Sequence, residues 1–310
     1  MSGAIDLHQH WWSPRLREVL GEIGLLHDGV LHLDGEPPYP LDLADHDLAA
    51  RRAQDGADGI DVVLYSLSSP LGLETLEPRR ARDVLTAWHA DASDLPPGTG
   101  LWAAAGLIEP DPAQLAEDLR RPGVVGLQVP ATALATPQAL ERLAPLLAVL
   151  EDDDRPLLVH PGPARPSPAA DLAALPGWWP ALTDYVAQQQ AAWFAWRVAG
   201  RALLPRLRVG FVALAGLAPL LHERSVQRGG PAPVDDEGVF YETSSFGAVG
   251  VGALLNAVGV GAIVHGTDRP YAAPLDLGAT APEAAVRTHN ARRFLGPAAL
   301  AQVVGAPAIL

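Results

Sequence analysis

Eight short runs of apolar residues recur along the chain, and each is close to continuously hydrophobic. This pattern is typical of parallel strands that are buried on both faces, rather than of strands with one face in water. The runs predict strands at Ala4–His10, Ile60–Ser66, Leu101–Leu107, Val124–Val129, Leu157–His160, Leu207–Ala213, Val239–Ser245 and Ala262–Thr267.

Each predicted strand is followed by a segment with helical character, and several of these segments carry proline in the first turn, where a helix tolerates it. The predicted helices are 42–55, 78–93, 112–121, 137–151, 182–204, 217–224, 247–258 and 282–294. Eight strands that alternate with eight helices predict an α/β fold, a (β/α)8 TIM barrel, in preference to a doubly wound open sheet. The length of 310 residues fits one domain that spans residues 1–310.

Polar residues interrupt the apolar runs where three of the strands end. His8 and His10 end the first strand, His160 ends the fifth, and Asp268 follows the eighth. Because alternate residues of a strand share a face, the rings of His8 and His10 are expected to point the same way. The carboxyl ends of barrel strands meet at one rim, so the four side chains predict one divalent metal site there. The alternative is that the histidines only hydrogen-bond the rim loops.

Composition narrows the chemistry further. The chain has no cysteine, which excludes thiolate nucleophiles and thiolate metal sites. All 22 basic residues are arginine, so Schiff-base chemistry and a carboxylated lysine between two metals are excluded. A formal net charge of −14 argues against a nucleic-acid partner. No apolar run is long enough to suggest a membrane span or a leader segment, so a cytoplasmic protein is expected.

Three motifs together resemble the amidohydrolase-related metal enzymes, and more narrowly the branch typified by aminocarboxymuconate semialdehyde decarboxylase. They are Ile5-Asp6-Leu7-His8-Gln9-His10, Val159-His160 and Gly266-Thr267-Asp268-Arg269-Pro270. The resemblance spans nearly the whole chain. It implies that His8, His10, His160 and Asp268 bind one metal ion, zinc or alternatively manganese. As the carboxylate beside that ion, Asp268 is also our candidate for the acid–base group. Imidazole nitrogens and a carboxylate suit such an ion.

The sixth strand departs from that family. The family places a further histidine at its end, near the metal-bound water, whereas this chain has Ala213. An alanine side chain cannot accept a proton. Three alternatives follow: Asp268 acts alone, the reaction needs no activated water, or the barrel only binds a ligand. Asp6 shares the predicted inward face of His8 and is a candidate for orienting a ligand.

Three residues are candidates for substrate contact. Arg269 follows the predicted ligand and offers a guanidinium to a substrate carboxylate, with a salt bridge at the rim as the alternative. Trp12 and Trp178 lie in the long loops after strands one and five, where tryptophan suits an aromatic pocket. The alternative for these rings is loop packing or an oligomer interface.

These observations lead to three expectations for function. The first is metal-dependent hydrolysis of a small cyclic or aromatic carbonyl compound. The second is nonoxidative decarboxylation of an aromatic or unsaturated carboxylic acid, which Ala213 favours. The third is a barrel that binds a ligand without turnover. In each case the expected partner is a small molecule, with a homodimer possible.

Overall fold

Parallel strands form the centre of the molecule in a computed structural model that describes residues 3–73, 76–172, 174–232, 236–274, 276–277 and 282–304. The sheet has eight strands in the order β1-β5-β6-β7-β8-β9-β10-β11, and each neighbouring pair that is recorded runs parallel. These strands are β1 (Ala4–His10), β5 (Ile60–Ser66), β6 (Thr99–Ala103), β7 (Val124–Pro130), β8 (Leu157–His160), β9 (Val209–Phe211), β10 (Val239–Glu242) and β11 (Ile263–Val264).

The sheet closes on itself between its last and first strands. The segment after β11 runs beside β1, and backbone hydrogen bonds join Leu7 N to His265 O (3.0 Å), Asp268 N to His8 O (2.9 Å) and His10 N to Arg269 O (2.6 Å). This closure removes the free edges of the sheet. The (β/α)8 barrel is therefore confirmed, with Asp268 held directly against β1.

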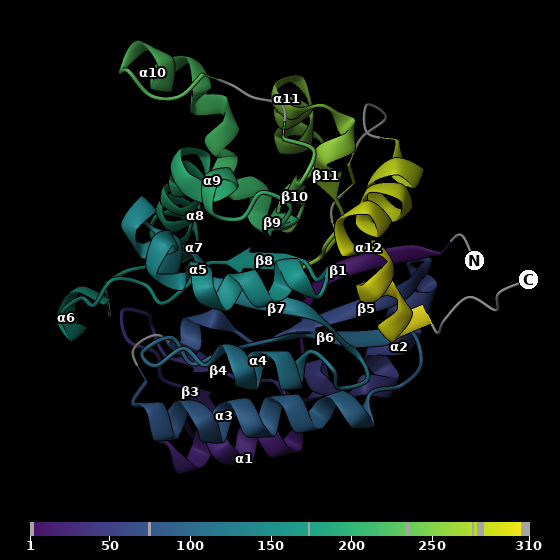
Figure 1. Cartoon of the computed structure of the whole chain (residues 1–310). Coiled ribbons are helices and arrows are strands. Elements are labelled where there is room, and N and C mark those ends of the chain that lie inside the picture. Colours follow the sequence, from purple (N-terminus) through teal and green to yellow (C-terminus); the bar gives the residue numbers. More distant parts are fainter. Residues whose placement is uncertain are drawn as a thin grey trace, which may run out of the picture.

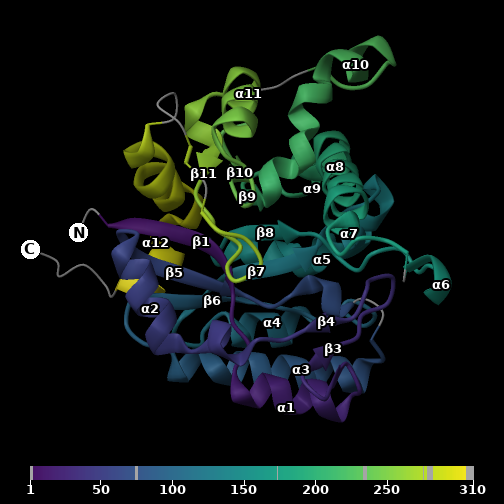
Figure 2. The same ribbon diagram turned by 180° about the vertical axis from the view of Figure 1, so that it is seen from behind.

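Helices surround the strands (Figures 1 and 2). The α-helices are α1 (Pro14–Glu22), α2 (Leu48–Ala57), α3 (Pro78–Asp91), α4 (Pro112–Asp118), α5 (Pro137–Asp152), α6 (Ala169–Leu172), α7 (Trp179–Leu182), α8 (Asp184–Ala195), α9 (Arg201–Leu203), α10 (His222–Gln227), α11 (Ala248–Val258) and α12 (Asn290–Val304). Short 3₁₀ segments lie at Leu43–His46, Ser69–Leu71, Ala92–Asp94, Ala131–Leu134 and Val260–Ala262, and π-helical turns lie at Trp196–Gly200 and Ala285–His289. The segment Ala213–Leu221 begins with five residues of positive φ. The loop after β1 carries a small antiparallel sheet of β2 (Leu26–His27), β3 (Val30–Leu31) and β4 (Tyr39–Pro40).

Two apolar cores hold these layers together. One lies between the strands and the outer helices, and the other fills the inside of the barrel. Helix α12 contributes Phe294 to the inner core, where its ring lies 5.2 Å from that of Phe240 and 5.8 Å from that of Trp102. The backbone oxygen of Phe294 also accepts a hydrogen bond from Arg208, which precedes β9. Helix α12 therefore closes the amino-terminal end of the barrel and leaves the opposite rim for chemistry.

Several element boundaries differ from those predicted. The strand predicted at Leu101–Leu107 begins two residues earlier, after a turn at Gly98 with a φ of +78°. The helix predicted at 182–204 is divided into α8, a π-helical turn and α9. The helix predicted at 217–224 begins only at His222, because positive φ values through Leu217 are incompatible with a right-handed α-helix.

Candidate metal centre

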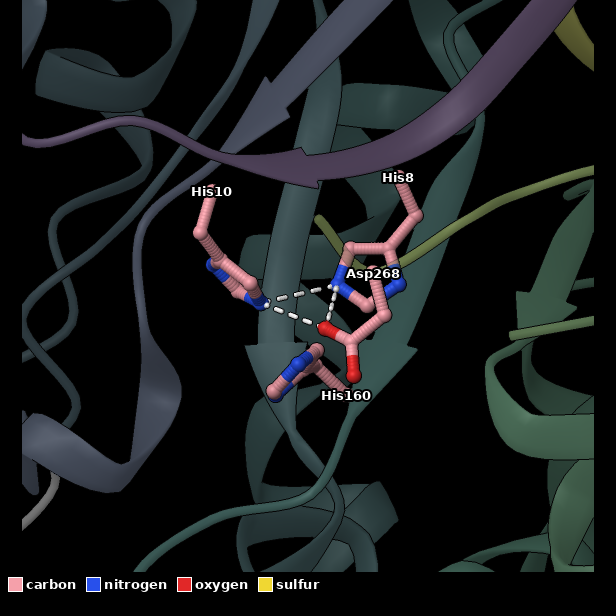
Figure 3. A group of neighbouring side chains, drawn as sticks. All are labelled: His8, His10, His160 and Asp268. Carbon is pink, nitrogen blue, oxygen red and sulfur yellow. Dashed lines mark hydrogen bonds and ion pairs between the residues drawn. The ribbon is translucent and has the colours of Figure 1, made fainter. Parts of the chain in front are cut away.

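Four side chains converge at the carboxyl rim of the barrel (Figure 3). His8 and His10 come from the end of β1, His160 from the end of β8, and Asp268 from the segment that follows β11. One ligand atom from each residue lies within 4.8 Å of the other three. His8 Nε2 lies 3.1 Å from His10 Nε2, and Asp268 Oδ1 lies 3.1 Å from His10 Nε2 and 3.7 Å from His8 Nε2.

The spacings of 3.1 to 3.7 Å among His8, His10 and Asp268 suit one ion. Ligand atoms about 2.05 Å from a tetrahedral zinc lie about 3.3 Å from each other. The three histidines are buried, whereas the Asp268 side chain is 24% exposed, so the open side of the site lies at the carboxylate. Three imidazoles and one carboxylate are the donors that a divalent zinc or manganese ion accepts.

In His10 and His160, the hydrogen-bond partner of Nδ1 decides which ring nitrogen carries the hydrogen. His10 Nδ1 lies 3.0 Å from the backbone oxygen of Ser66, and His160 Nδ1 lies 2.8 Å from that of Pro161. A carbonyl oxygen only accepts, so each Nδ1 must carry the hydrogen. The lone pair on each Nε2 is then free for a metal ion.

Burial and charge act differently on the ionisable groups of the site. Burial lowers the pKa of His160 well below its ordinary value, and the nearby His8 and His10 lower it further. Burial also lowers the pKa of His10, more than Asp268 raises it. Burial alone would raise the pKa of Asp268, but the neighbouring imidazoles of His10 and His8 outweigh it and lower the pKa. Asp268 is thus held as a carboxylate, and His10 and His160 are held neutral, which is the protonation state that a metal ion requires.

Arg269 lies away from this opening. Its side chain is 7% exposed, and its Nη1 lies 3.2 Å from Asp55 Oδ1 while its Nη2 bonds Asp58. Both carboxylates belong to α2 or its carboxyl-terminal cap. The guanidinium thus forms the salt bridge that was the alternative to a substrate clamp.

The two tryptophan candidates also contact other groups. Trp12 is buried, its ring lies 6.1 Å from that of His46, and its backbone N–H donates to His46 Nδ1 at 3.1 Å. Trp178 is 56% exposed and its ring packs against Trp179, 5.7 Å away. The described contacts of both rings are with these neighbours, so the loop-packing alternative accounts for them.

Asp6 does not share the face of His8 and His10. The register of β1 against β5 shifts between Asp6 and Gln9, which breaks the expected alternation. Asp6 accepts hydrogen bonds from Gln9 Nε2 (2.7 Å) and from the hydroxyl (2.7 Å) and backbone N–H (3.1 Å) of Thr267. It therefore joins the segment that bears Asp268 to β1 and does not orient a histidine ring.

Aromatic side chains that sequence reasoning did not select lie beside the ligands. The ring of Tyr271 lies 5.2 Å from that of His10, and the ring of Tyr39 lies 5.6 Å from that of Tyr271. Both are partly exposed, and they come from the segment after Asp268 and from β4. Tyr185 of α8 donates a hydrogen bond to Glu36, which joins the loop after β1 to the loop after β8. Nothing in the local sequence marks these tyrosines, because long loops bring them together.

A second missed group is Glu242, the last residue of β10, which is fully buried. Its Oε2 lies 3.6 Å from His8 Nδ1 and 3.3 Å from the backbone nitrogen of Ala213. The rule that selected the ligands, a polar residue that ends an apolar strand, would also have selected this one.

Comparison with solved structures shows the same fold in other proteins. An amidohydrolase II matches with a TM-score of 0.74 and 18% identity over 94% of this chain and 99% of that one. The apo IDCase of Metarhizium anisopliae matches with a TM-score of 0.72 and 18% identity over 94% and 97% of the two chains. The 5-carboxyvanillate decarboxylase of Novosphingobium aromaticivorans, complexed with manganese and 4-hydroxy-3-methoxy-5-nitrobenzoic acid, matches with a TM-score of 0.69 and 16% identity over 94% and 96%.

No family model matches the chain, and no curated protein matches it. The similarity is therefore one of fold along almost the entire length, as the motifs predicted. In the part of the chain that the structure describes, no helix is both long and apolar enough to cross a membrane.

Proposed function

We propose that this protein is a metal-dependent, nonoxidative decarboxylase of a small aromatic carboxylic acid. This was the second of the expectations from sequence, and two observations raise it above hydrolysis. The structures with the same fold include 2,6-dihydroxybenzoate and 5-carboxyvanillate decarboxylases. The chain also has Ala213 where the family has a histidine to activate water, and decarboxylation consumes no water.

The observation that carries the proposal is the convergence of His8, His10, His160 and Asp268 beside a partly exposed aromatic pair. When bound, the divalent ion would supply positive charge that holds the substrate's oxygens and withdraws electrons from the ring. We assign zinc or manganese, since manganese is present in matched decarboxylases and the donor set suits either ion.

The protein's own groups would do the rest. The rings of Tyr271 and Tyr39 would receive the face or edge of the aromatic substrate. Asp268, held ionised, would take a proton from an acidic group of the substrate and deliver it to the ring carbon that bears the carboxylate. The bond from that carbon to the carboxylate would then break, its electron pair would restore the aromatic ring, and carbon dioxide would leave. One proton enters and one carbon dioxide leaves for each product.

The test is a panel of hydroxybenzoates assayed for carbon dioxide release in deuterium oxide. We expect release that chelator treatment abolishes, with one deuterium in the product at the former carboxylate position. Asp268→Asn should lower kcat by about 10²- to 10⁴-fold, as expected for loss of a general acid–base group. Asp83→Asn, which changes an exposed aspartate of α3, serves as the matched control. Incorporation of ¹⁸O from labelled water without carbon dioxide release would identify a hydrolase instead.

A further inference from the structure

The ring of His8 differs from the other two histidines in what holds its outer nitrogen. His10 and His160 face backbone carbonyl oxygens, whereas His8 Nδ1 lies 3.1 Å from the hydroxyl oxygen of Ser244. A hydroxyl can donate or accept, so Ser244 alone does not decide which nitrogen of His8 carries the hydrogen.

The neighbouring Glu242 decides it. Glu242 Oε1 accepts the backbone N–H of Ser244 at 2.7 Å, and Oε2 accepts the backbone N–H of Ala213 at 3.3 Å. The Ser244 hydroxyl also bonds Oε2. Backbone N–H groups donate to both oxygens of Glu242, and a carboxylate only accepts, so the Ser244 hydroxyl donates to Oε2. The oxygen of Ser244 is then left to accept from His8 Nδ1–H.

We propose that Glu242 and Ser244 form a positioning relay, which holds His8 in the tautomer whose Nε2 lone pair faces the metal site. The inference rests on the metal centre of the proposed function and not on the reaction catalysed there. Glu242 is a positioning residue, because it reaches the site only through Ser244 and His8. It also uses the backbone N–H of Ala213, the residue that replaces the family's strand-six histidine.

The same contacts explain a glycine of the third motif. A Cβ placed at Gly266 would overlap the carboxylate of Glu242. The absence of a side chain at Gly266 therefore leaves the space in which Glu242 lies. Any larger residue there would push the carboxylate out of line with Ser244 and His8.

Two substitutions separate this relay from a merely structural role. In Glu242→Gln, the Ser244 N–H holds the amide oxygen, so the amide NH₂ takes the place of Oε2. That NH₂ donates to Ser244, whose hydroxyl then donates to His8 Nδ1 and favours the tautomer with hydrogen on Nε2. In Ser244→Ala, Glu242 lies only 3.6 Å from His8 Nδ1 and can accept directly. The glutamine variant should therefore be the more damaging one.

The experiment measures zinc affinity by competition with a chromophoric chelator, and the His8 tautomer from ¹⁵N shifts of the zinc-loaded protein. Glu242→Gln should weaken zinc binding about 10- to 100-fold, the usual cost of losing an outer partner of a metal-bound histidine. Ser244→Ala should weaken it less, and Gly266→Ala should resemble Glu242→Gln. Glu237→Gln, at an exposed position just before β10, is the matched control.

Each outcome bears on the relay. Unchanged affinity in Glu242→Gln, or a loss in Ser244→Ala that equals or exceeds it, would overturn the proposal. So would wild-type protein that binds no zinc, which would also remove the metal centre. Wild-type protein that binds zinc with the expected order of variants, but releases no carbon dioxide from aromatic acids, would refute the proposed reaction and support the relay.

Discussion

Replacing Arg269 by methionine tests whether this residue serves the substrate or the fold. Methionine keeps much of the apolar length of the arginine side chain and removes its charge. Asp55 is fully buried, and its contact with Arg269 is an ion pair of 3.2 Å. Gln9 Nε2 donates to the same oxygen at 3.0 Å, while Asp55 Oδ2 has no hydrogen-bond partner among the described residues. Burial already raises the pKa of Asp55 more than Gln9 and the nearby arginines lower it.

The size of the effect follows from these contacts. Breaking a buried ion pair by removal of one partner costs about 3–5 kcal/mol. The loss of stability in Arg269→Met cannot exceed the cost of protonating Asp55, because a protonated Asp55 no longer leaves a buried charge. Neutralising a carboxyl of ordinary pKa costs about 4 kcal/mol at pH 7 and only about 1.5 kcal/mol at pH 5. The pKa of Asp55 is raised in the folded state, so the loss of stability grows as the pH rises above the pKa of Asp55 in the unfolded chain. For 310 residues, an unfolding entropy of about 2.1 cal/mol/K per residue converts 4 kcal/mol to a fall in Tm of about 6 °C.

Thermal unfolding of Arg269→Met at pH 7 and at pH 5 measures the loss of stability at each pH. We expect the larger fall in Tm at pH 7. Arg269→Met combined with Asp55→Asn should recover most of the loss, because no buried charge is left unpaired. Asp58→Asn should cost under about 1 kcal/mol, since Asp58 is 35% exposed. A variant with wild-type Tm and a raised KM would refute the structural role and restore the clamp.

Three further outcomes are expected. Tyr271→Ala should raise KM for an aromatic acid about 2- to 10-fold, because it removes an aromatic contact worth about 0.5–1.5 kcal/mol. Tyr271→Phe keeps the ring and should change KM little. Equal effects of the two substitutions would contradict an aromatic contact. Burial raises the pKa of Asp118, but the hydrogen bonds from His89 and Arg121 outweigh it and lower the pKa. Asp118→Asn should therefore cost about 1–3 kcal/mol between pH 5 and 8, and the difference from wild type should shrink below about pH 4, as denaturant titrations at several pH values would show. Elemental analysis of freshly purified protein should find one zinc or manganese ion per chain. The Asp268→Asn variant should bind that ion more weakly. A variant that retains as much metal as the wild type would remove Asp268 from the ligand set.

The barrel and the convergence of four polar side chains at its rim were predictable because both follow from the order of short segments along the chain. Continuous apolar runs indicate parallel strands, and ligands that end such runs must meet at one rim once the sheet closes. The boundaries of β1, β5 and β8 agree with prediction because polar residues or turns limit those runs sharply. Prediction was weaker at β9, β10 and β11, which end two or three residues before the predicted positions. Apolar residues continue after β9, whereas β10 and β11 are followed by polar residues and glycine, whose backbone leaves the strand only in the folded barrel.

Only the tertiary structure decided what surrounds the ligands. The direction of the Arg269 side chain depends on α2, which lies more than 200 positions earlier in the chain. The alternation of residues along β1 could not reveal the register shift that turns Asp6 away from His8. The neighbours of His8 and His10 are equally remote in sequence. Glu242 ends β10 and Ser244 follows it, while Tyr39 belongs to β4 and Tyr271 to the segment after Asp268. A sequence pattern specifies which residues share a face of one element, whereas hydrogen-bond direction and side-chain contact depend on elements that only folding brings together.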